Sequence, residues 1–396
     1  MNRDDFEILK TGIIYFDNGA TTLKPKILSL ATSDYYNYYS SNAHRGDYAL
    51  SLKASAEYDS SREKVAKLIN ASNDEVVFTS GTTDSLNKIV FGFFKDYLKK
   101  DDEVLLTVSE HASNILPWFE LALQTGIKVK YIDLSSDYKV NLENVKKAIS
   151  DKTKVISLAH ITNVIGDIRP IEEIVKYAHE KNILVVVDGA QSVPHMKVDV
   201  KKLDVDFLAF SAHKMCGPTG VGVLYGKKEL LDKTKPIIFG GGMNASFEND
   251  GYREYKEVPE KLEAGTPNIA GVIGFGYVID YLNSIGFDNI HKRELELKKY
   301  LLERLKEIDD VTIYNEKSES GIVTINYKDI FSQDLSIYLD KYNICTRAGS
   351  HCAKILKDEL HIKNTLRISL YFYNTEEEID KLILALKNPN IKNEII

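Results

Sequence analysis

The chain has 396 residues, of which 43% are hydrophobic and 28% are charged, and its formal net charge is -7. This length predicts two domains, and the composition is that of a soluble globular protein. No run of Lys and Arg stands out, which argues against nucleic acid as the main partner. The first ten residues lack the pattern of a signal peptide, and the longest apolar runs have the length of a strand, so a membrane span is not expected. Three cysteines are too few for a disulfide framework and are expected to be thiols in a reducing cytoplasm.

Short apolar runs rich in β-branched and aromatic residues alternate with amphipathic stretches over the first two thirds of the chain. The strand-like runs cover residues 14–16, 76–79, 104–108, 129–132, 155–159, 183–187, 207–210 and 221–225. Amphipathic stretches between them cover residues 85–98, 143–149 and 171–181. This alternation predicts an α/β fold with a mostly parallel sheet that is covered on both faces.

The pattern changes after residue 267. Two helices are expected at 269–284 and 287–308, broken at Gly286, and further helices at 333–342 and 376–386. Strands are expected at 311–314, 322–326 and 366–370. We therefore predict a large domain over residues 15–266 and a smaller α+β domain over residues 267–396, which also takes in residues 1–14.

A lysine follows the apolar run at 207–210, in the sequence Ser211-Ala212-His213-Lys214, and a turn rich in Gly and Pro comes next. In a parallel sheet, ligands bind at the carboxyl ends of the strands, where an uncompensated lysine is costly to bury. A Schiff base with an aldehyde cofactor resolves this conflict. Taken alone, Lys214 has the alternative of an ordinary surface lysine.

A carboxylate, Asp188, ends the apolar run at 184–187. A pyridine nitrogen stays protonated only beside a fixed anion, and protonation makes the ring an electron sink. Gln191, three residues further on, can donate a hydrogen bond to a ring hydroxyl. Taken alone, Asp188 has the alternative of a helix cap.

Two more polar groups follow strands. Residues 79–84, with Thr82 and Thr83, precede an expected helix whose free N–H groups offer a phosphate cradle. His111 follows another strand and could stack on a flat ring and move protons. Alone, these are a helix cap and a loop histidine. Together with Lys214 and Asp188 they supply the parts of a pyridoxal phosphate (PLP) site.

Cys352 follows Arg347 in the run Arg347-Ala348-Gly349-Ser350-His351-Cys352. A thiol is a nucleophile only as thiolate, which nearby Arg347 and His351 and a following helix start would favour. The alternative is an inert loop cysteine. The remaining two cysteines are expected to be packing residues: Cys216 and Cys345.

As an ordered set, these motifs resemble the class V aminotransferases of PLP fold type I, and within them the SufS-type (group II) cysteine desulfurases. The resemblance runs from residue 15 to the last helix. It is carried by Gly81-Thr82-Thr83, Glu110-His111, Thr162-Asn163-Val164-Ile165-Gly166, Asp188-Gly189-Ala190-Gln191, Ser211-Ala212-His213-Lys214, Glu263-Ala264-Gly265-Thr266-Pro267-Asn268 and the run ending in Cys352.

The resemblance implies an enzyme that converts L-cysteine to L-alanine and takes the sulfur onto Cys352 as a persulfide. It also implies a cytoplasmic homodimer with shared active sites and a sulfur-acceptor protein that feeds iron–sulfur cluster assembly. In this family pattern Lys214 holds PLP and moves the substrate proton, Asp188 pairs with the pyridine nitrogen, Gln191 contacts the ring oxygen, and His111 stacks on the ring.

The resemblance also assigns residues to the phosphate and the substrate. The residues implied for the phosphate are Thr82, Thr83, Ser211, His213 and, from the neighbouring subunit, Thr266. Those implied for the substrate are Asn163, Arg347 and Arg367, since an Arg fork suits a carboxylate. His44 and Arg45 resemble a His-Arg-Gly element near the mouth of the site.

The chain departs from the family pattern in one place. Many relatives have His-His-Cys where this chain has Ser350-His351-Cys352, so the role of the first histidine is missing here. The segment with the cysteine is shorter than the mobile loop of NifS/IscS-type (group I) enzymes, which suggests a guarded thiol. The alternatives that remain open are a selenocysteine lyase, another class V aminotransferase, and a non-catalytic scaffold or sulfur-carrier partner. No metal-ligand spacing is present.

Overall fold

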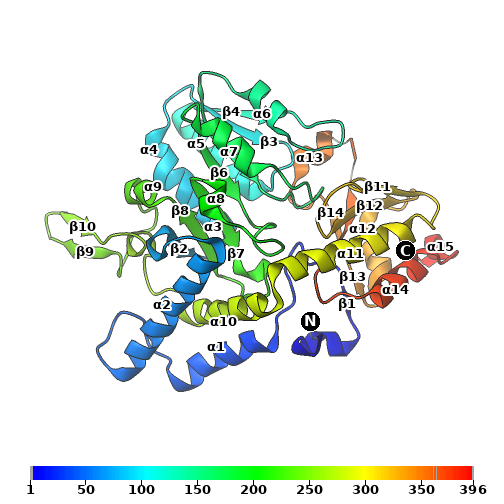
Figure 1. Ribbon diagram of the computed structural model, residues 1–396, viewed down its shortest axis with the longest axis horizontal. Coiled ribbons are helices and arrows are strands. Elements are labelled where there is room, and N and C mark those ends of the chain that lie inside the picture. The colour runs from blue at the N-terminus through cyan, green and yellow to red at the C-terminus, as the bar shows by residue number, and fades with distance from the viewer. Residues whose placement is uncertain (1–2, 360, 363, 395–396) are drawn as a thin grey trace.

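The computed structural model describes residues 3–359, 361–362 and 364–394. The first two and last two residues of the predicted small domain, 1–2 and 395–396, lie outside the described residues, as do positions 360 and 363. A seven-stranded sheet, of strand order β2-β8-β7-β6-β5-β3-β4, forms the centre of the larger part of the molecule (Figure 1). Its strands are β2 (Val76–Thr79), β3 (Glu103–Thr107), β4 (Lys128–Ile132), β5 (Thr153–Ala159), β6 (Leu184–Asp188), β7 (Phe207–Ser211) and β8 (Gly222–Gly226). Only β8 runs antiparallel to its neighbours. The predicted α/β fold with a mostly parallel sheet is confirmed.

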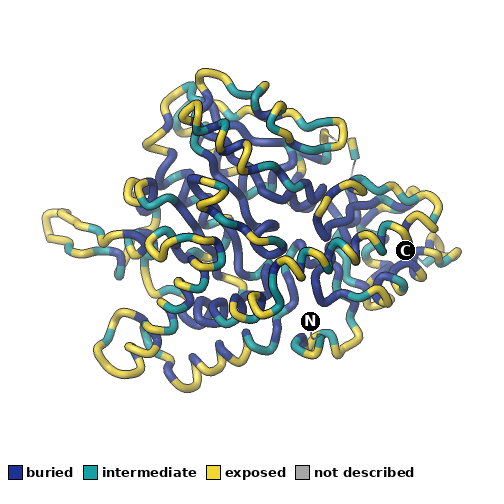
Figure 2. The backbone as a smooth tube through the Cα atoms, in the orientation of Figure 1, coloured by how far each residue is buried: buried dark blue, intermediate teal, exposed yellow. Residues whose placement is uncertain are grey.

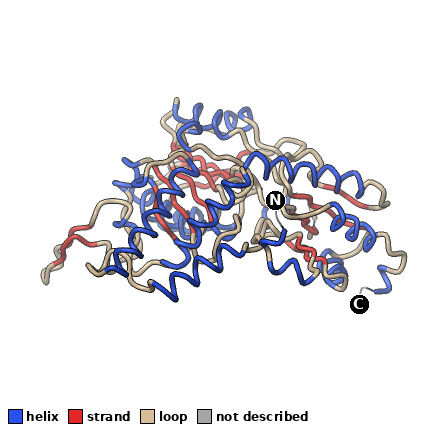
Figure 3. Tube along the Cα trace, turned by 60° about the horizontal axis from the view of Figure 1, so that its bottom comes forward, coloured by secondary structure: helices blue, strands red, loops and turns tan. Residues whose placement is uncertain are grey.

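Alternate residues of the central strands pack on opposite faces of this sheet. Val185 and Val187 belong to one apolar core, whereas Val186 belongs to another on the opposite face. The first core also receives α6 (Leu142–Ala148), α7 (Ile171–His179) and α8 (Val200–Leu203), and the second receives α3 (Thr82–Ile89), α5 (Leu116–Thr125) and α9 (Lys228–Lys233). Helices therefore lie on both sides of the strands (Figure 3). The helix expected at 85–98 begins earlier, at Thr82, and passes through a π-helical turn, Val90–Phe94, into α4 (Lys95–Tyr97).

The C-terminal part holds a second, antiparallel sheet of strand order β11-β12-β15-β14. Its strands are β11 (Val311–Ile313), β12 (Ile322–Tyr327), β14 (Arg347–Gly349) and β15 (Thr365–Ser369). One apolar core joins this sheet to α11 (Phe287–Leu305), α12 (Ser332–Asp340), α14 (Glu376–Leu386) and α15 (Ile391–Glu394). The predicted α+β arrangement of the C-terminal part is thus present, and α13 (Lys354–Glu359) follows β14.

The apolar run at residues 14–16 was expected among the strands of the parallel sheet, and that placement is wrong. β1 (Ile14–Tyr15) pairs in parallel with β13 (Ile344–Cys345), and Phe16 lies in the core of the C-terminal part. A run this short has no period that selects one sheet over another, so the choice depends on the tertiary contacts.

The helix α10 (Ile269–Ile285) follows the predicted domain boundary at residue 266 but packs against α1 (Lys26–Tyr38) and α2 (Ala49–Ile69). Gly286, with φ of 87°, separates α10 from α11, and the two helices are bent by 70°. Among the described residues no single helix has the length and hydropathy of a membrane span, and this bent pair meets both only when taken together. The boundary itself stays a prediction.

A hairpin of β9 (Asn244–Phe247) and β10 (Arg253–Tyr255) extends away from the body of the molecule (Figure 2). Most of its residues are exposed, and Phe247 has an exposed fraction of 73%. The sequence analysis did not predict this hairpin, nor α1 and α2.

Candidate active site

A cavity of about 190 Å³ lies where the carboxyl ends of the parallel strands meet the C-terminal sheet. Ligands of open α/β sheets bind at this edge. The structure brings almost every sequence-predicted residue to its lining: Thr82, Thr83, His111, Asn163, Asp188, Gln191, Ser211, His213, Lys214, Arg347, Cys352 and Arg367. Thr266 is not among them.

Lys214 and Asp188 are the oppositely charged pair of this cavity. Lys214 ends the 3-10 turn η6 (Ala212–Lys214) that follows β7, and burial lowers its pKa to about 8 against the opposing effect of Asp188. Asp188 ends β6, where burial raises its pKa to about 6 and Lys214 opposes the rise; its Oδ1 accepts a hydrogen bond of 2.9 Å from the Ala190 amide. An amine with this pKa is available in its neutral, nucleophilic form near neutral pH.

The peptide that precedes Lys214 is held unusually firmly. The His213 carbonyl accepts hydrogen bonds from the Thr22 amide (3.1 Å), from the hydroxyls of Thr21 (3.0 Å) and Thr22 (3.1 Å), and from Lys24 Nζ (2.7 Å). Burial lowers the pKa of Lys24 to about 8. These groups could not be predicted from the sequence, because their partner is a backbone carbonyl that carries no signal in the sequence.

The start of α3, predicted as a phosphate cradle, lies against the end of β7. The Thr82 amide donates to Ser211 Oγ at 2.8 Å, and the two side-chain hydroxyls lie 2.6 Å apart. β8 passes directly behind this turn: a Cβ added to Gly222 would lie 2.4 Å from Gly81 Cα. Glycine at 222 is therefore what allows the helix start to reach the end of β7.

His111 caps the 3-10 turn η5 (Ala112–Asn114), where its Nδ1 accepts a hydrogen bond of 3.1 Å from the Ser113 amide. Burial, followed by the charges of Lys214, Arg367 and Arg347, lowers the pKa of His111 to about 4. The ring is therefore neutral at pH 7. Because Nδ1 accepts, the ring proton lies on Nε2.

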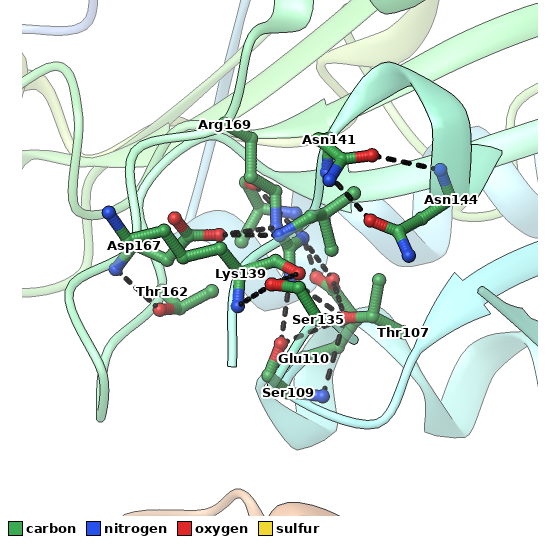
Figure 4. Close-up of polar contacts among 12 residues, drawn as sticks. Thr107, Ser109, Glu110, Ser135, Lys139, Asn141, Asn144, Thr162, Asp167 and Arg169 are labelled. Atoms are coloured by element: carbon green, nitrogen blue, oxygen red, sulfur yellow. Dashed lines mark hydrogen bonds and ion pairs between the residues drawn. The ribbon is translucent and has the colours of Figure 1, made fainter. Parts of the chain in front are cut away.

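Glu110, which precedes His111 in the chain, forms a fully buried ion pair with Arg169 (Figure 4). Glu110 and Arg169 bond to each other, and Glu110 Oε2 accepts from Asn114 Nδ2 (2.8 Å) and from the Ala159 amide (2.7 Å). Arg169 also donates to the hydroxyl of Thr107, at the end of β3, and to that of Ser109, just after it, at 2.7 Å each. These contacts fix the loop that carries His111 to the end of β5, which lies beside Asp188 in the sheet.

Two arginines reach the cavity from paired positions of the C-terminal sheet, Arg347 on β14 and Arg367 on β15. Arg367 is buried. Its Nη1 donates to the Asn163 carbonyl and its Nη2 to Asp17, both at 3.0 Å. A Cβ at Gly19 would lie 3.1 Å from its Cζ, so a side chain at this position would crowd the guanidinium.

Several buried polar atoms at the cavity have no hydrogen-bond partner among the described residues. They are Gln191 Oε1, Asn163 Oδ1, Arg367 Nε and His351 Nδ1. The other side-chain atoms of two of these amides are engaged: Gln191 Nε2 donates to the Gly19 carbonyl and Asn163 Nδ2 to the His351 carbonyl. Orphaned polar atoms beside an amine, a buried carboxylate and a helix start fit a ligand with aldehyde, ring-nitrogen and phosphate groups. In the described part of the chain, no group of three or more His, Cys, Asp and Glu side chains could hold a metal ion.

Cys352 is exposed, whereas Cys216 is buried and Cys345 half-buried. It lies on a turn closed by the Ala353 amide and the Ser350 carbonyl (2.8 Å), with positive φ at both central residues, 50° at His351 and 58° at Cys352. The Ala112 amide donates to the Cys352 carbonyl at 2.8 Å, next to His111. The C-terminal part thus presents the thiol at the mouth of the cavity through a turn that is fixed to the large sheet's loops.

Thr266, His44 and Arg45 lie together outside this cavity. All three are exposed, and Thr266 Oγ1 accepts a hydrogen bond of 3.3 Å from Asn42 Nδ2. His44 and Arg45 line a second cavity of about 250 Å³. Their position therefore does not support a role for these residues in the cavity that Lys214 of the same chain lines.

The fold and the cavity define a class of α/β protein with a lysine, a carboxylate and a helix start gathered at one sheet edge. The family model for aminotransferase class-V matches residues 14–382. The chain belongs to this family.

Among its relatives is a probable cysteine desulfurase of Halalkalibacterium halodurans, 44% identical over 97% of this chain and 94% of the relative. A cysteine desulfurase of Haloferax volcanii is 41% identical over 95% of this chain and 89% of the relative. Among solved structures, the apo cysteine desulfurase of Thermococcus onnurineus is similar with a TM-score of 0.94 and 39% identity, over 99% of this chain and 97% of that one. A cysteine desulfurase of Escherichia coli is similar with a TM-score of 0.93 and 34% identity, over 100% and 98%.

Proposed function

We propose that this protein is a PLP-dependent cysteine desulfurase, which converts L-cysteine to L-alanine and takes the sulfur onto Cys352. The observation that carries the proposal is the composition of the cavity. It places Lys214 and Asp188, from the large sheet, opposite Arg367 and Cys352, from the C-terminal part. Relatives named as cysteine desulfurases match nearly the whole chain, which supports the same activity.

When bound, PLP supplies an aldehyde that condenses with an amine and a protonated ring that withdraws electrons from bonds at the substrate Cα. The residues that would hold it are Lys214 at the aldehyde, Asp188 at the ring nitrogen, and the start of α3 with Ser211 at the phosphate. Asp188 would stabilise a proton on the ring nitrogen, because a buried carboxylate beside a cation stays ionised. The neutral amine of Lys214 then takes the proton from the substrate Cα.

The other residues bind substrate and receive its sulfur. Arg367, through donors that Asn163 and Asp17 leave free, binds the substrate carboxylate. The Cys352 thiolate attacks the sulfur of the bound cysteine, so that an S–S bond forms and the C–S bond breaks. The electron pair of the C–S bond stays with the carbon, which takes a proton, and His111, which lines the cavity, would donate it. The products are L-alanine and a persulfide on Cys352.

The test measures alanine and sulfide released from L-cysteine in the presence of a thiol reductant. We expect the wild-type protein to release both products in equal amounts, and Cys352→Ala and Lys214→Ala to release neither above background. Cys352→Ala must keep the absorbance of bound PLP, which shows that only the sulfur step is lost. Full sulfide release by Cys352→Ala would contradict the proposal and leave a different class V reaction.

We further propose a sulfur-acceptor protein that discharges Cys352, as in group II desulfurases that feed iron–sulfur cluster assembly in the cytoplasm. The exposure of the thiol supports this, since a second protein can reach it. The short, fixed turn supports group II rather than group I. Persulfide that forms on Cys352 with L-cysteine alone should turn over slowly until an acceptor thiol protein is added, and this can be followed by mass spectrometry.

We also propose a homodimer in which Thr266 contacts the phosphate in the site of the partner subunit, with His44 and Arg45 near its mouth. Their exposed position outside this chain's first cavity supports the proposal. Mixing subunits tests it. Heterodimers of Thr266→Ala and Lys214→Ala should regain one complete site and its activity, whereas no recovery on mixing would place Thr266 in its own subunit's site or in none.

A further inference from the structure

Ser113 lies between two predicted site residues but was not itself predicted. Its Oγ is 3.0 Å from His111 Nδ1 and 2.8 Å from Thr83 Oγ1, and its amide donates to the same Nδ1 at 3.1 Å. Ser113 also lines the cavity. A hydroxyl thus joins the imidazole on η5 to the first turn of α3, where the phosphate cradle is.

Counting protons shows what this hydroxyl can do. The Ser113 amide can only donate, so His111 Nδ1 is an acceptor. The Ser113 hydroxyl has one proton, which goes either to Nδ1 or to Thr83. In the first case Ser113 accepts its second bond from Thr83, and Thr83 has no proton left for an anion. In the second case Thr83 is free to donate to an anion, and a lone pair of Ser113 Oγ then faces Nδ1.

These two arrangements have opposite effects on the imidazole. A donating Ser113 hydroxyl stabilises the unprotonated Nδ1, whereas a lone pair facing Nδ1 favours a proton on that nitrogen. The charged groups from other elements that lower the pKa of His111 are cations, Lys214 on η6, Arg367 on β15 and Arg347 on β14, and the Asp188 carboxylate lines the same cavity. On its own loop, the Glu110 carboxylate is engaged by Arg169. Without an anion, the first arrangement therefore agrees with a neutral ring.

We propose that Ser113 is a positioning residue whose hydroxyl reports the occupancy of the phosphate cradle to His111. An anion at the start of α3 draws the Thr83 proton, Ser113 turns its own proton to Thr83, and His111 holds a proton more readily. The imidazole is thereby prepared as a proton donor only when the cradle is filled. This proposal rests on the proposed function only for the identity of the anion as a phosphate.

Nitrogen NMR of the His111 imidazole tests the coupling without a turnover assay. The protein is titrated with acid in the PLP-loaded form, and in a PLP-free form with and without inorganic phosphate. In the wild type, we expect the Nε2–H tautomer and an increase in the pKa of His111 when phosphate or PLP is present. In Ser113→Ala, most of this increase should be lost, and Ser113→Thr, which keeps a hydroxyl, should restore it.

Two outcomes would overturn the proposal. One is a phosphate-induced pKa increase in Ser113→Ala equal to that of the wild type, which would mean that charge alone acts through space. The other is an Nδ1–H tautomer in the wild type without phosphate or PLP. Ser29→Ala, on an exposed turn of α1 whose hydroxyl bonds only locally, is the matched control and should leave His111 unchanged. A failed desulfurase assay with an intact coupling would count against the proposed function but not against this inference.

Discussion

At the scale of single residues, Asp188 is expected to cost stability while serving the reaction. Its pKa is about 6 in the folded chain against 3.8 when unperturbed, so between these values the folded protein holds a proton that the unfolded chain has lost. The free energy of unfolding of the PLP-free protein therefore falls as pH rises through this interval. The cost reaches about 3 kcal/mol above pH 6.

Asp188→Asn should thus stabilise the PLP-free protein at pH 7.5 by up to about 3 kcal/mol, with a difference that shrinks toward pH 4. The same variant should lose ~10²-fold or more in alanine formation, because the ring nitrogen has no anion beside it. Denaturant unfolding at several pH values and a rate measurement check both. An unfolding free energy that is lower than that of the wild type at pH 7.5 would contradict the assignment.

At the scale of elements, the turn that carries Cys352 is strained, because a non-glycine residue with positive φ costs about 1 kcal/mol. Cys352→Gly and Cys352→Ala both lack the thiol and differ only in this strain. We expect the glycine variant to be the more stable by about 1 kcal/mol in denaturant unfolding. Equal stabilities would mean that the turn relaxes when the thiol is removed.

The buried pair of Glu110 and Arg169 offers a second prediction at this scale. Glu110→Gln leaves a buried guanidinium without its main partner, which should lower the free energy of unfolding by roughly 3–5 kcal/mol. Glu120→Gln, on the exposed face of α5, is the matched control and should change it by less than about 0.5 kcal/mol. A small effect of Glu110→Gln would show that Asp167, whose Oδ2 lies 3.8 Å from Arg169 Nε, is a sufficient partner.

At the scale of the whole molecule, the N-terminal segment joins the first core of the large sheet to the core of the C-terminal part. Phe6 is fully buried against Tyr281, Phe372 and Tyr373 in the first core, whereas Phe16 lies in the core of the C-terminal part. Phe6→Ala should lower the free energy of unfolding by about 3–5 kcal/mol. The exposed Ile8→Ala is the control. Calorimetry of Phe6→Ala should show a lower unfolding temperature for the whole chain. A lower unfolding temperature for only one of the two parts would contradict the joining role.

The residues that line the cavity could be predicted from the sequence, whereas most of the contacts that hold them in place could not. Lys214, Asp188, His111 and the start of α3 each follow an apolar strand, and parallel strands deliver their carboxyl ends to one edge, so the pattern along the chain was enough to group them. Arg367 lies on the separate antiparallel sheet and Cys352 on a turn that follows one of its strands, and only the family resemblance predicted that they meet the cavity.

Other features could not be predicted, because they depend on contacts between distant residues. The four donors to the His213 carbonyl and the bond from the Ser113 hydroxyl to His111 have no periodic signal in the sequence. The pairing of β1 with β13 joins residues 330 positions apart through two-residue strands, which carry no period that selects a partner.

The hydrogen bond from the Ala112 amide to the Cys352 carbonyl links the turn that carries the thiol to the loop that carries His111. A displacement of the backbone at Cys352 would therefore break a contact made by the residue next to His111 in the chain. We expect such a displacement to move the thiol and the imidazole together, whereas a rotation of the Cys352 side chain alone leaves this contact intact.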